Sequence, residues 1–135
     1  MPSFAEQVRR GHENARQRVQ LAVRRISITA VNDIILISPV DTGRFRGNWQ
    51  ASIGSVNFSV NDAADPTGQR SLSDADFVIS GFDEGQVFFF SNSLPYARRL
   101  EFGHSLQAPS PPGIVRRAAQ RARETLNTVF GELRP

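Results

Sequence analysis

The chain has 135 residues, of which 39% are hydrophobic, so we expect residues 1–135 to form a single domain around one modest core. It contains no cysteine, which excludes disulfide bonds and thiolate metal sites. No apolar run has the length of a membrane span or the form of a signal peptide. We therefore expect a soluble intracellular protein without a membrane partner.

All 16 basic residues are arginine, and the formal net charge is +3. Arginine is suited to bidentate pairing with carboxylate or phosphate, although codon bias in a GC-rich genome produces the same composition. The charge is unevenly placed. Residues 1–37 carry six arginines against three acids, residues 114–135 five against two, and residues 61–84 one against six. The chain has basic ends and an acidic middle.

A long helix is expected at the N-terminus. Ser3 and Glu6 have the spacing of a capping box, and no proline occurs between Pro2 and Pro39. The pattern predicts one helix over Phe4–Ile37, about 50 Å long at ~1.5 Å per residue.

The apolar residues of this helix lie on two sides. One stripe runs along its whole length and should face the core: Phe4, Val8, Ala15, Val19, Val23, Ile26, Ala30, Ile34 and Ile37. The second stripe occupies the last four turns: Leu21, Ile28, Val31 and Ile35. We expect the second stripe to contact a neighbouring subunit, because a chain of this size has difficulty covering both sides. The alternative is that the C-terminal helix covers it.

Residues 1–18 are predicted to form an extended helical arm. Between Arg9 and Arg18 there is almost no apolar side chain, and Gly11 weakens the helix. Such an arm would be solvated, and would fray or become ordered on binding a partner.

The remaining elements follow from turn residues and alternation. Pro39 ends the helix, Asp41 can bond its own backbone two residues on, and Gly43 tolerates a positive φ. The expected elements are strands within 45–60, 77–80 and 86–91, a mobile loop over 61–76, a short helix over 95–102 and a closing helix over 114–130. The fold class is α+β: a long N-terminal helix and a C-terminal helix packed on a small, mostly antiparallel sheet of three or four strands.

Residues 40–43 (Val-Asp-Thr-Gly) match the core of the aspartic-protease signature, in which an Asp on a strand pairs with another across a dimer axis. Here Arg44 follows where a small residue is needed, and a helix ending at Ser38-Pro39 precedes. A turn stabilised by Asp41 explains the same residues, and we favour it.

Other chemistry is poorly supported. The two histidines, His12 and His104, have no partners at ligand spacing, so we expect no metal. There is no phosphate-binding loop or nucleophile motif, so we expect no cofactor, no catalytic residues and no enzymatic activity.

Nucleic-acid binding is a stronger alternative, because six arginines lie on the long helix: Arg9, Arg10, Arg16, Arg18, Arg24 and Arg25. Glu6, Glu13 and Asp33 share this helix, and no base-reading motif accompanies them. A solvated helix face with salt bridges accounts for these six arginines, and non-specific contact with DNA remains an alternative.

Three segments, in order, carry a family resemblance. They are residues 38–46 (SPVDTGRFR) with Trp49, residues 96–104 (YARRLEFGH), and Ala108-Pro109 leading into residues 113–118 (GIVRRA). In this order the chain resembles the head–tail joining and tail-completion proteins of tailed-phage necks, a family similar to lambda protein Z. It departs from that pattern at Phe45, where leucine is frequent, and before Ile114, where an aromatic residue is common.

The resemblance implies a structural virion protein, assembled in the host cytoplasm. It would form a ring, a homohexamer, between head-completion or adaptor proteins and the tail terminator or tail tube. The tail terminator itself is the nearest alternative, and some arginines would face the lumen with its packaged DNA. From other classes, a DNA-binding accessory protein and a dimeric aspartic protease remain as alternatives.

The motif residues would have architectural roles. We expect Arg44 or Arg46 to pair with Glu101, and Tyr96 with Phe102 to pack the short helix beneath Trp49. The full set is Asp41, Thr42, Gly43, Arg44, Arg46, Trp49, Tyr96, Glu101, Phe102 and Gly103.

Overall fold

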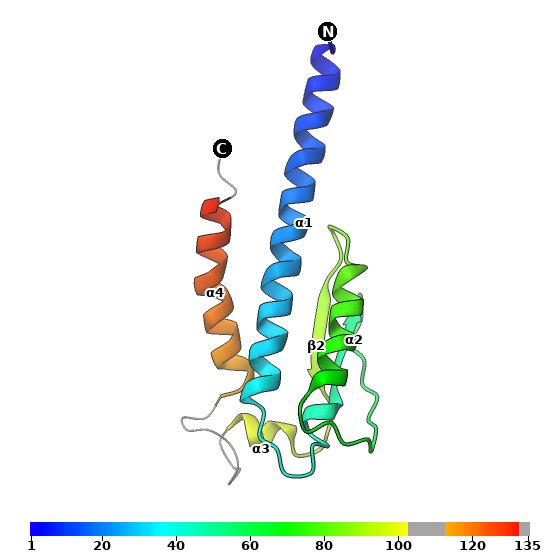
Figure 1. Ribbon diagram of the computed structural model, residues 1–135, viewed down its shortest axis with the longest axis vertical. Coiled ribbons are helices and arrows are strands. Elements are labelled where there is room, and N and C mark those ends of the chain that lie inside the picture. Colours follow the sequence, from blue (N-terminus) through cyan, green and yellow to red (C-terminus); the bar gives the residue numbers. More distant parts are fainter. Residues whose placement is uncertain (103–112, 133–135) are drawn as a thin grey trace.

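A computed structural model describes residues 1–102 and 113–132, and its elements are drawn in Figure 1. They are α1 (Phe4–Ile37), a 3-10 turn η1 (Arg46–Asn48), β1 (Trp49–Ile53), α2 (Gln69–Ser80), β2 (Phe88–Asn92), α3 (Ala97–Glu101) and α4 (Val115–Glu132). The α+β class, with its long N-terminal helix, C-terminal helix and small antiparallel sheet, is confirmed.

The capping box predicted for α1 is present. The backbone N–H of Ser3 donates to Glu6 Oε2 at 2.7 Å, and the N–H of Glu6 donates to Ser3 Oγ at 3.2 Å. At the other end, the N–H of Ser38 donates to Ile34 O at 3.0 Å before Pro39 turns the chain away. These local signals set both ends of α1.

The sheet is smaller than predicted. In the described residues it has two antiparallel strands, with Trp49 opposite Asn92 and Ile53 opposite Phe88. The third strand, predicted over 77–80, is the last turn of α2. The short apolar run there belongs to a helix whose other buried positions precede it, and a run of that length does not distinguish helix from strand.

Helix α2 also replaces part of the loop predicted over 61–76, since residues 69–76 are helical. Three buried residues spaced by four, Ser71, Ala75 and Ile79, form its inner face. Asp65 Oδ2 accepts the backbone N–H of Ser71 at 3.0 Å near the start of α2, and so satisfies one helix-terminal donor.

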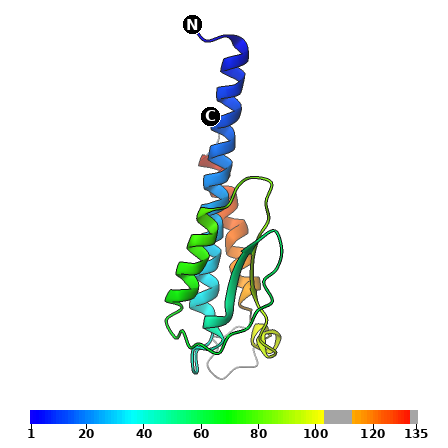
Figure 2. The ribbon, with the colours of Figure 1, turned by 90° about the vertical axis from the view of Figure 1, so that its right-hand side faces the viewer.

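The helices are arranged around the C-terminal half of α1. Helix α4 lies along one side of α1 and α2 with the sheet along another, as Figures 1 and 2 show. The buried core joins all of these elements: Val31, Ile34, Ile35, Phe45, Trp49, Ala75, Ile79, Leu94, Ile114 and Ala118.

The predicted subunit interface of Leu21, Ile28, Val31 and Ile35 is wrong for its inner members. Val31 is 1% exposed and Ile35 2%, both within the core of the chain, and Ile28 packs against that core. A Cβ added at Gly68, just before α2, would overlap Ile35 Cγ2, so the start of α2 covers this side of α1. Of the four residues, Leu21 alone is largely exposed.

Candidate assembly surfaces

The segment that carries the first motif is fixed around Ser38. Its hydroxyl donates to Ile34 O at 2.6 Å and accepts the indole N–H of Trp49 at 2.9 Å. Trp49 stacks on Phe90 of β2 with ring centroids 5.1 Å apart, and Phe45 meets its edge at 5.7 Å. The segment therefore locks the end of α1 to the sheet.

Gly43 holds the turn after α1. Its φ of +91° suits glycine, and its carbonyl accepts the N–H groups of Gly47 at 2.9 Å and Asp65 at 3.0 Å. The side chain that accepts a backbone N–H two residues on is Thr42, whose Oγ1 lies 3.2 Å from Arg44 N. Asp41 was expected to accept the N–H of Gly43, two residues on; it is exposed and makes no such bond among the described residues, so this prediction is wrong.

The predicted ion pair between Glu101 and Arg44 or Arg46 is also wrong. Arg44 pairs with Asp62 at 3.1 Å. Arg46 donates to two carbonyls, Pro66 O and Ser38 O, each at 2.8 Å. Burial lowers the pKa of Arg46, while nearby Asp65 acts in the opposite direction. Both arginines fasten the segment before α2 to the motif turn.

Glu101 instead caps α4. Its carboxylate accepts the backbone N–H groups of Ile114 and Val115 at 2.8 Å and of Arg116 at 3.2 Å. Burial of Glu101 favours a higher pKa, but these bonds and the Arg116 side chain outweigh burial and lower the pKa. The partners lie 13 to 15 residues along the chain, so no local spacing pointed to them.

The two aromatic residues of the second motif, Tyr96 and Phe102, lie in different surroundings. Tyr96 packs against Phe45, with ring centroids 6.2 Å apart, in the cluster around Trp49. Phe102 is 50% exposed and lies against two guanidinium groups, of Arg98 at 5.9 Å and Arg116 at 4.9 Å. It does not support α3 beneath Trp49 as expected. Gly103 and His104 lie outside the described residues.

Many polar groups of the motif residues are engaged within the chain, although the Nε atoms of Arg44 and Arg46 are buried without a hydrogen-bond partner among the described residues. Exposed apolar side chains lie on α1 and α2. Among the described residues, no group of three histidine, aspartate or glutamate side chains is placed to hold a metal ion.

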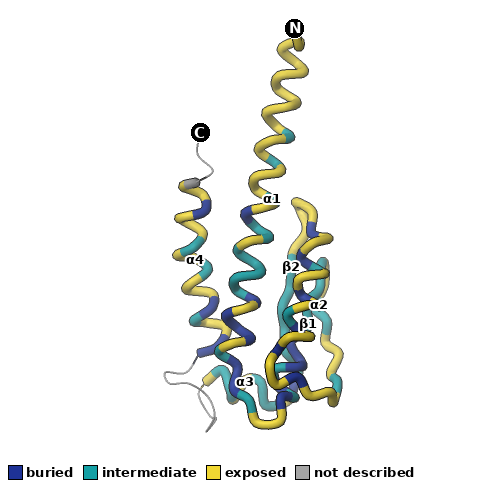
Figure 3. Tube along the Cα trace, in the orientation of Figure 1, coloured by how far each residue is buried: buried dark blue, intermediate teal, exposed yellow. Residues whose placement is uncertain are grey.

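One such surface is the N-terminal half of α1, residues 4–20. It projects beyond the other elements and is exposed, as Figure 3 shows. Residues 1–12 are all exposed, and Ala22 is the first buried residue of the helix. The first apolar stripe was expected to face the core throughout, which is wrong for four residues, here called the arm stripe: Phe4, Val8, Ala15 and Val19.

The six arginines of α1 fall into two groups. Arg16 pairs with Glu13 at 3.1 Å and Glu84 at 3.8 Å, and Arg24 donates to Phe82 O at 2.9 Å, so these two hold the loop after α2. The rest, Arg9, Arg10, Arg18 and Arg25, are exposed.

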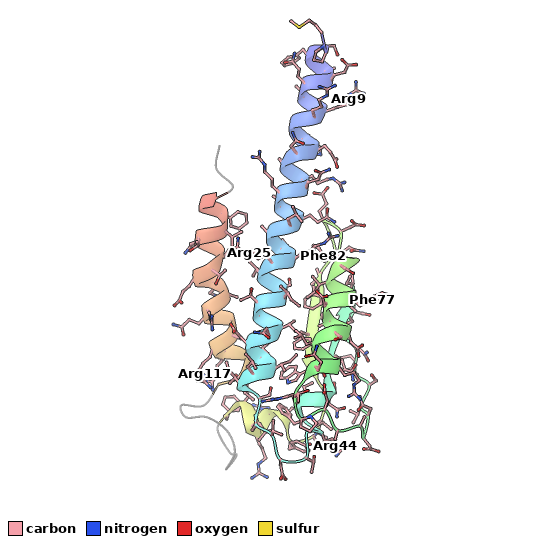
Figure 4. The ribbon with its side chains drawn as sticks, in the orientation of Figure 1. Arg9, Arg25, Arg44, Phe77, Phe82 and Arg117 are labelled. Carbon is pink, nitrogen blue, oxygen red and sulfur yellow. The ribbon has the colours of Figure 1, made fainter. Side chains whose placement is uncertain are left out.

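Helix α2 presents a further surface. Phe77 is 81% exposed, and Asp74 and Asp76 beside it are exposed as well. Figure 4 shows Phe77 on the outer side of α2 and Arg9 near the free end of α1. Among the large apolar side chains of the described residues only Met1 is more exposed, and Phe4 is equally exposed.

In the part of the chain that the structure describes, every helix is too short or too polar to span a bilayer. Comparison of the chain with protein-family models, curated proteins and solved structures gives no match.

Proposed function

We propose that the chain is a structural subunit of a tailed-bacteriophage neck. It forms a ring, a homohexamer, that joins head-completion proteins to the tail during virion assembly. The observation that carries this proposal is the N-terminal half of α1, a helix without a covering partner in the described chain that bears exposed apolar residues.

The physical argument concerns helix stability. In proteins most of the stability of a helix comes from packing of its apolar face, and the N-terminal half of α1 has no such packing in the described chain. This segment contains Gly11 in its middle, where no other part of the chain comes within 4 Å of an added Cβ. Its helix is therefore best stabilised by another molecule, as in an assembly protein.

Two further observations support the same proposal. The three sequence segments that resemble neck proteins occur in the family order. In the fold, residues of these segments make the contacts that hold α1, the sheet and α4 together: Ser38, Trp49 and Glu101. A rigid body with one projecting helix is suited to mechanical joining.

The test is co-assembly. The purified chain should form rings visible by electron microscopy, and should co-sediment with purified head-completion and tail proteins of the same phage. A chain that binds only the tail tube, and not the head side, would indicate the tail terminator. A chain that joins neither would contradict the proposal.

One observation favours a function of another class. Arg9, Arg10 and Arg18 are exposed and have no ion-pair partner among the described residues, which suits contact with DNA phosphates. A DNA-binding accessory protein would retard a DNA duplex in a gel at low salt, and its affinity for the duplex would fall steeply as the salt concentration rises. The neck proposal does not require such binding by the unassembled chain.

A further inference from the structure

We propose that the N-terminal half of α1 docks on the outer face of α2 of a second copy of this chain, in a head-to-tail contact. This inference rests on the proposed function in so far as both require self-association. It adds which two surfaces meet and why.

The first surface is an apolar stripe with a basic border. At 3.6 residues per turn, the arm stripe (Phe4, Val8, Ala15 and Val19) follows one side of the helix. Arg9 and Arg18 border it on its two sides, while the acids Glu6 and Glu13 lie on the far side. Phe4 is 81% exposed and Val8 53%.

This stripe is the continuation of a surface that the fold already covers. Further along α1, Ala22 is buried and Ile26 half-buried on the same side, which faces α4. Asp33, also on this side, pairs with Arg121 of α4 at 3.2 Å. Helix α4 does not reach the N-terminal turns, so the stripe emerges uncovered (Figure 1).

The second surface has the opposite charge around an apolar centre. Phe77 lies in the middle of the exposed side of α2, with Asp74 and Asp76 on either side of it. Arg70, on the same helix, donates to Gly47 O and is directed to the body of the molecule. An apolar stripe with arginines at its edges thus meets an apolar residue with carboxylates at its edges.

A single chain cannot make this contact with itself. Helix α1 is continuous from Phe4 to Ile37, and the loop after α2 is held to it by Gln20 and Arg24, both bonded to Phe82 O. The N-terminal turns therefore point away from α2 of the same molecule. Because the two surfaces differ, each copy has one of each unused, and such heterologous contacts propagate into rings or filaments.

The N-terminal segment of α1 and helix α2 have compatible lengths. The helix from Phe4 to Val19 is about 24 Å long and α2 about 18 Å, at ~1.5 Å per residue. The N-terminal segment of one copy therefore spans the whole outer face of α2 in the next.

Two single substitutions test the contact against matched controls. Phe77→Ser should weaken self-association at least about tenfold, as expected for a central aromatic residue, whereas Phe58→Ser, at another exposed phenylalanine, should not. Arg18→Glu should weaken it more than Arg10→Glu, because Arg10 lies on the side of α1 opposite the stripe. Circular dichroism checks that each variant keeps its helix content.

Mixing two defective variants tests the head-to-tail geometry. A Val8→Ser chain retains its α2 surface, and a Phe77→Ser chain retains its arm stripe. Each should be monomeric alone at a concentration where the wild type associates. Together they should form a one-to-one dimer, with twice the 15.0 kDa mass of the chain, and nothing larger.

The outcomes separate this inference from the proposed function. A wild-type ring that Phe77→Ser leaves intact overturns the contact but not the neck function. An effect of Val8→Ser without one of Phe77→Ser overturns it as well, and indicates pairing between arms or with a foreign protein. A wild-type chain that never associates, alone or with neck partners, overturns both.

Discussion

Replacing Glu101 with alanine should loosen the start of α4. The carboxylate of Glu101, whose side chain is only 18% exposed, accepts three backbone N–H groups there. Loss of a helix N-cap lowers the free energy of unfolding by about 0.5–2 kcal/mol, and hydrogen bonds to a charged group contribute about 1.5–3 kcal/mol. Because water can reach part of this helix end in the variant, we expect a total loss of about 2–3 kcal/mol.

Urea unfolding followed by circular dichroism, at one fixed protein concentration, measures this loss. Glu101→Gln keeps an acceptor but no charge, so it should lose about 1 kcal/mol at neutral pH. The pKa of Glu101 in the fold lies below its ordinary value of 4.5. Its ionised form therefore adds stability that is fully present above pH 4.5 and is lost as the pH falls through the folded pKa.

The wild type and Glu101→Gln should consequently converge in stability in acid well below pH 4.5. A difference that stays constant from neutral pH into acid would refute the role given to the charge. An alanine variant as stable as the wild type would refute the cap itself.

Three further substitutions, one with a matched control, test the fold. Gly43→Ala should lower the free energy of unfolding by about 2–4 kcal/mol, since the φ of Gly43 is +91° and a Cβ would meet the backbone N of Pro66 at 2.6 Å. The control Gly54→Ala, at a φ of +88° but in open space, should lower it by only about 1 kcal/mol. Trp49→Phe should lose about 2–3 kcal/mol in the same urea assay, because it removes the donor to the buried Ser38 hydroxyl and leaves a void. Gly11→Ala should stabilise the N-terminal turns of α1 by about 1 kcal/mol, seen as slower amide exchange at concentrations where the chain is monomeric.

The parts of the fold set by local signals could be predicted from the sequence. Both ends of α1 follow from the capping box at Ser3 and the proline at position 39, and α1 begins and ends at the predicted residues. Helix α4, Val115–Glu132, lies close to the predicted range because its apolar positions recur at helical spacing. Strand β1 lies inside its predicted range, and β2 (Phe88–Asn92) overlaps the range predicted over 86–91 and ends one residue beyond it.

The parts set by long-range contacts could not be predicted. The buried positions of α2, Ser71, Ala75 and Ile79, recur at helical spacing, but one is polar and one is small, so the pattern is weak in the sequence. The packing of Ala75 and Ile79 in a core with residues of α1 makes the helix clear. Periodicity also showed that α1 needs cover on two sides, but not which molecule supplies it. Val31 and Ile35 are covered by the chain itself, whereas Phe4 and Val8 are not.

The candidate sites show the same division. The turn at Gly43 and the involvement of its neighbour Thr42 could be predicted from the sequence. The partners of Arg44, Arg46 and Glu101 lie between 8 and 20 residues away in sequence and depend on how the segments meet in space. Phe77 was missed as a surface residue because its segment was assigned to a strand.

Whether the chain assembles with itself can be decided from the native mass of the purified protein. We expect one dominant species of six copies of the 15.0 kDa chain, which dissociates on Phe77→Ser and persists on Phe58→Ser. A single-copy mass at every concentration, unchanged when candidate neck proteins are added, would be incompatible with a neck subunit.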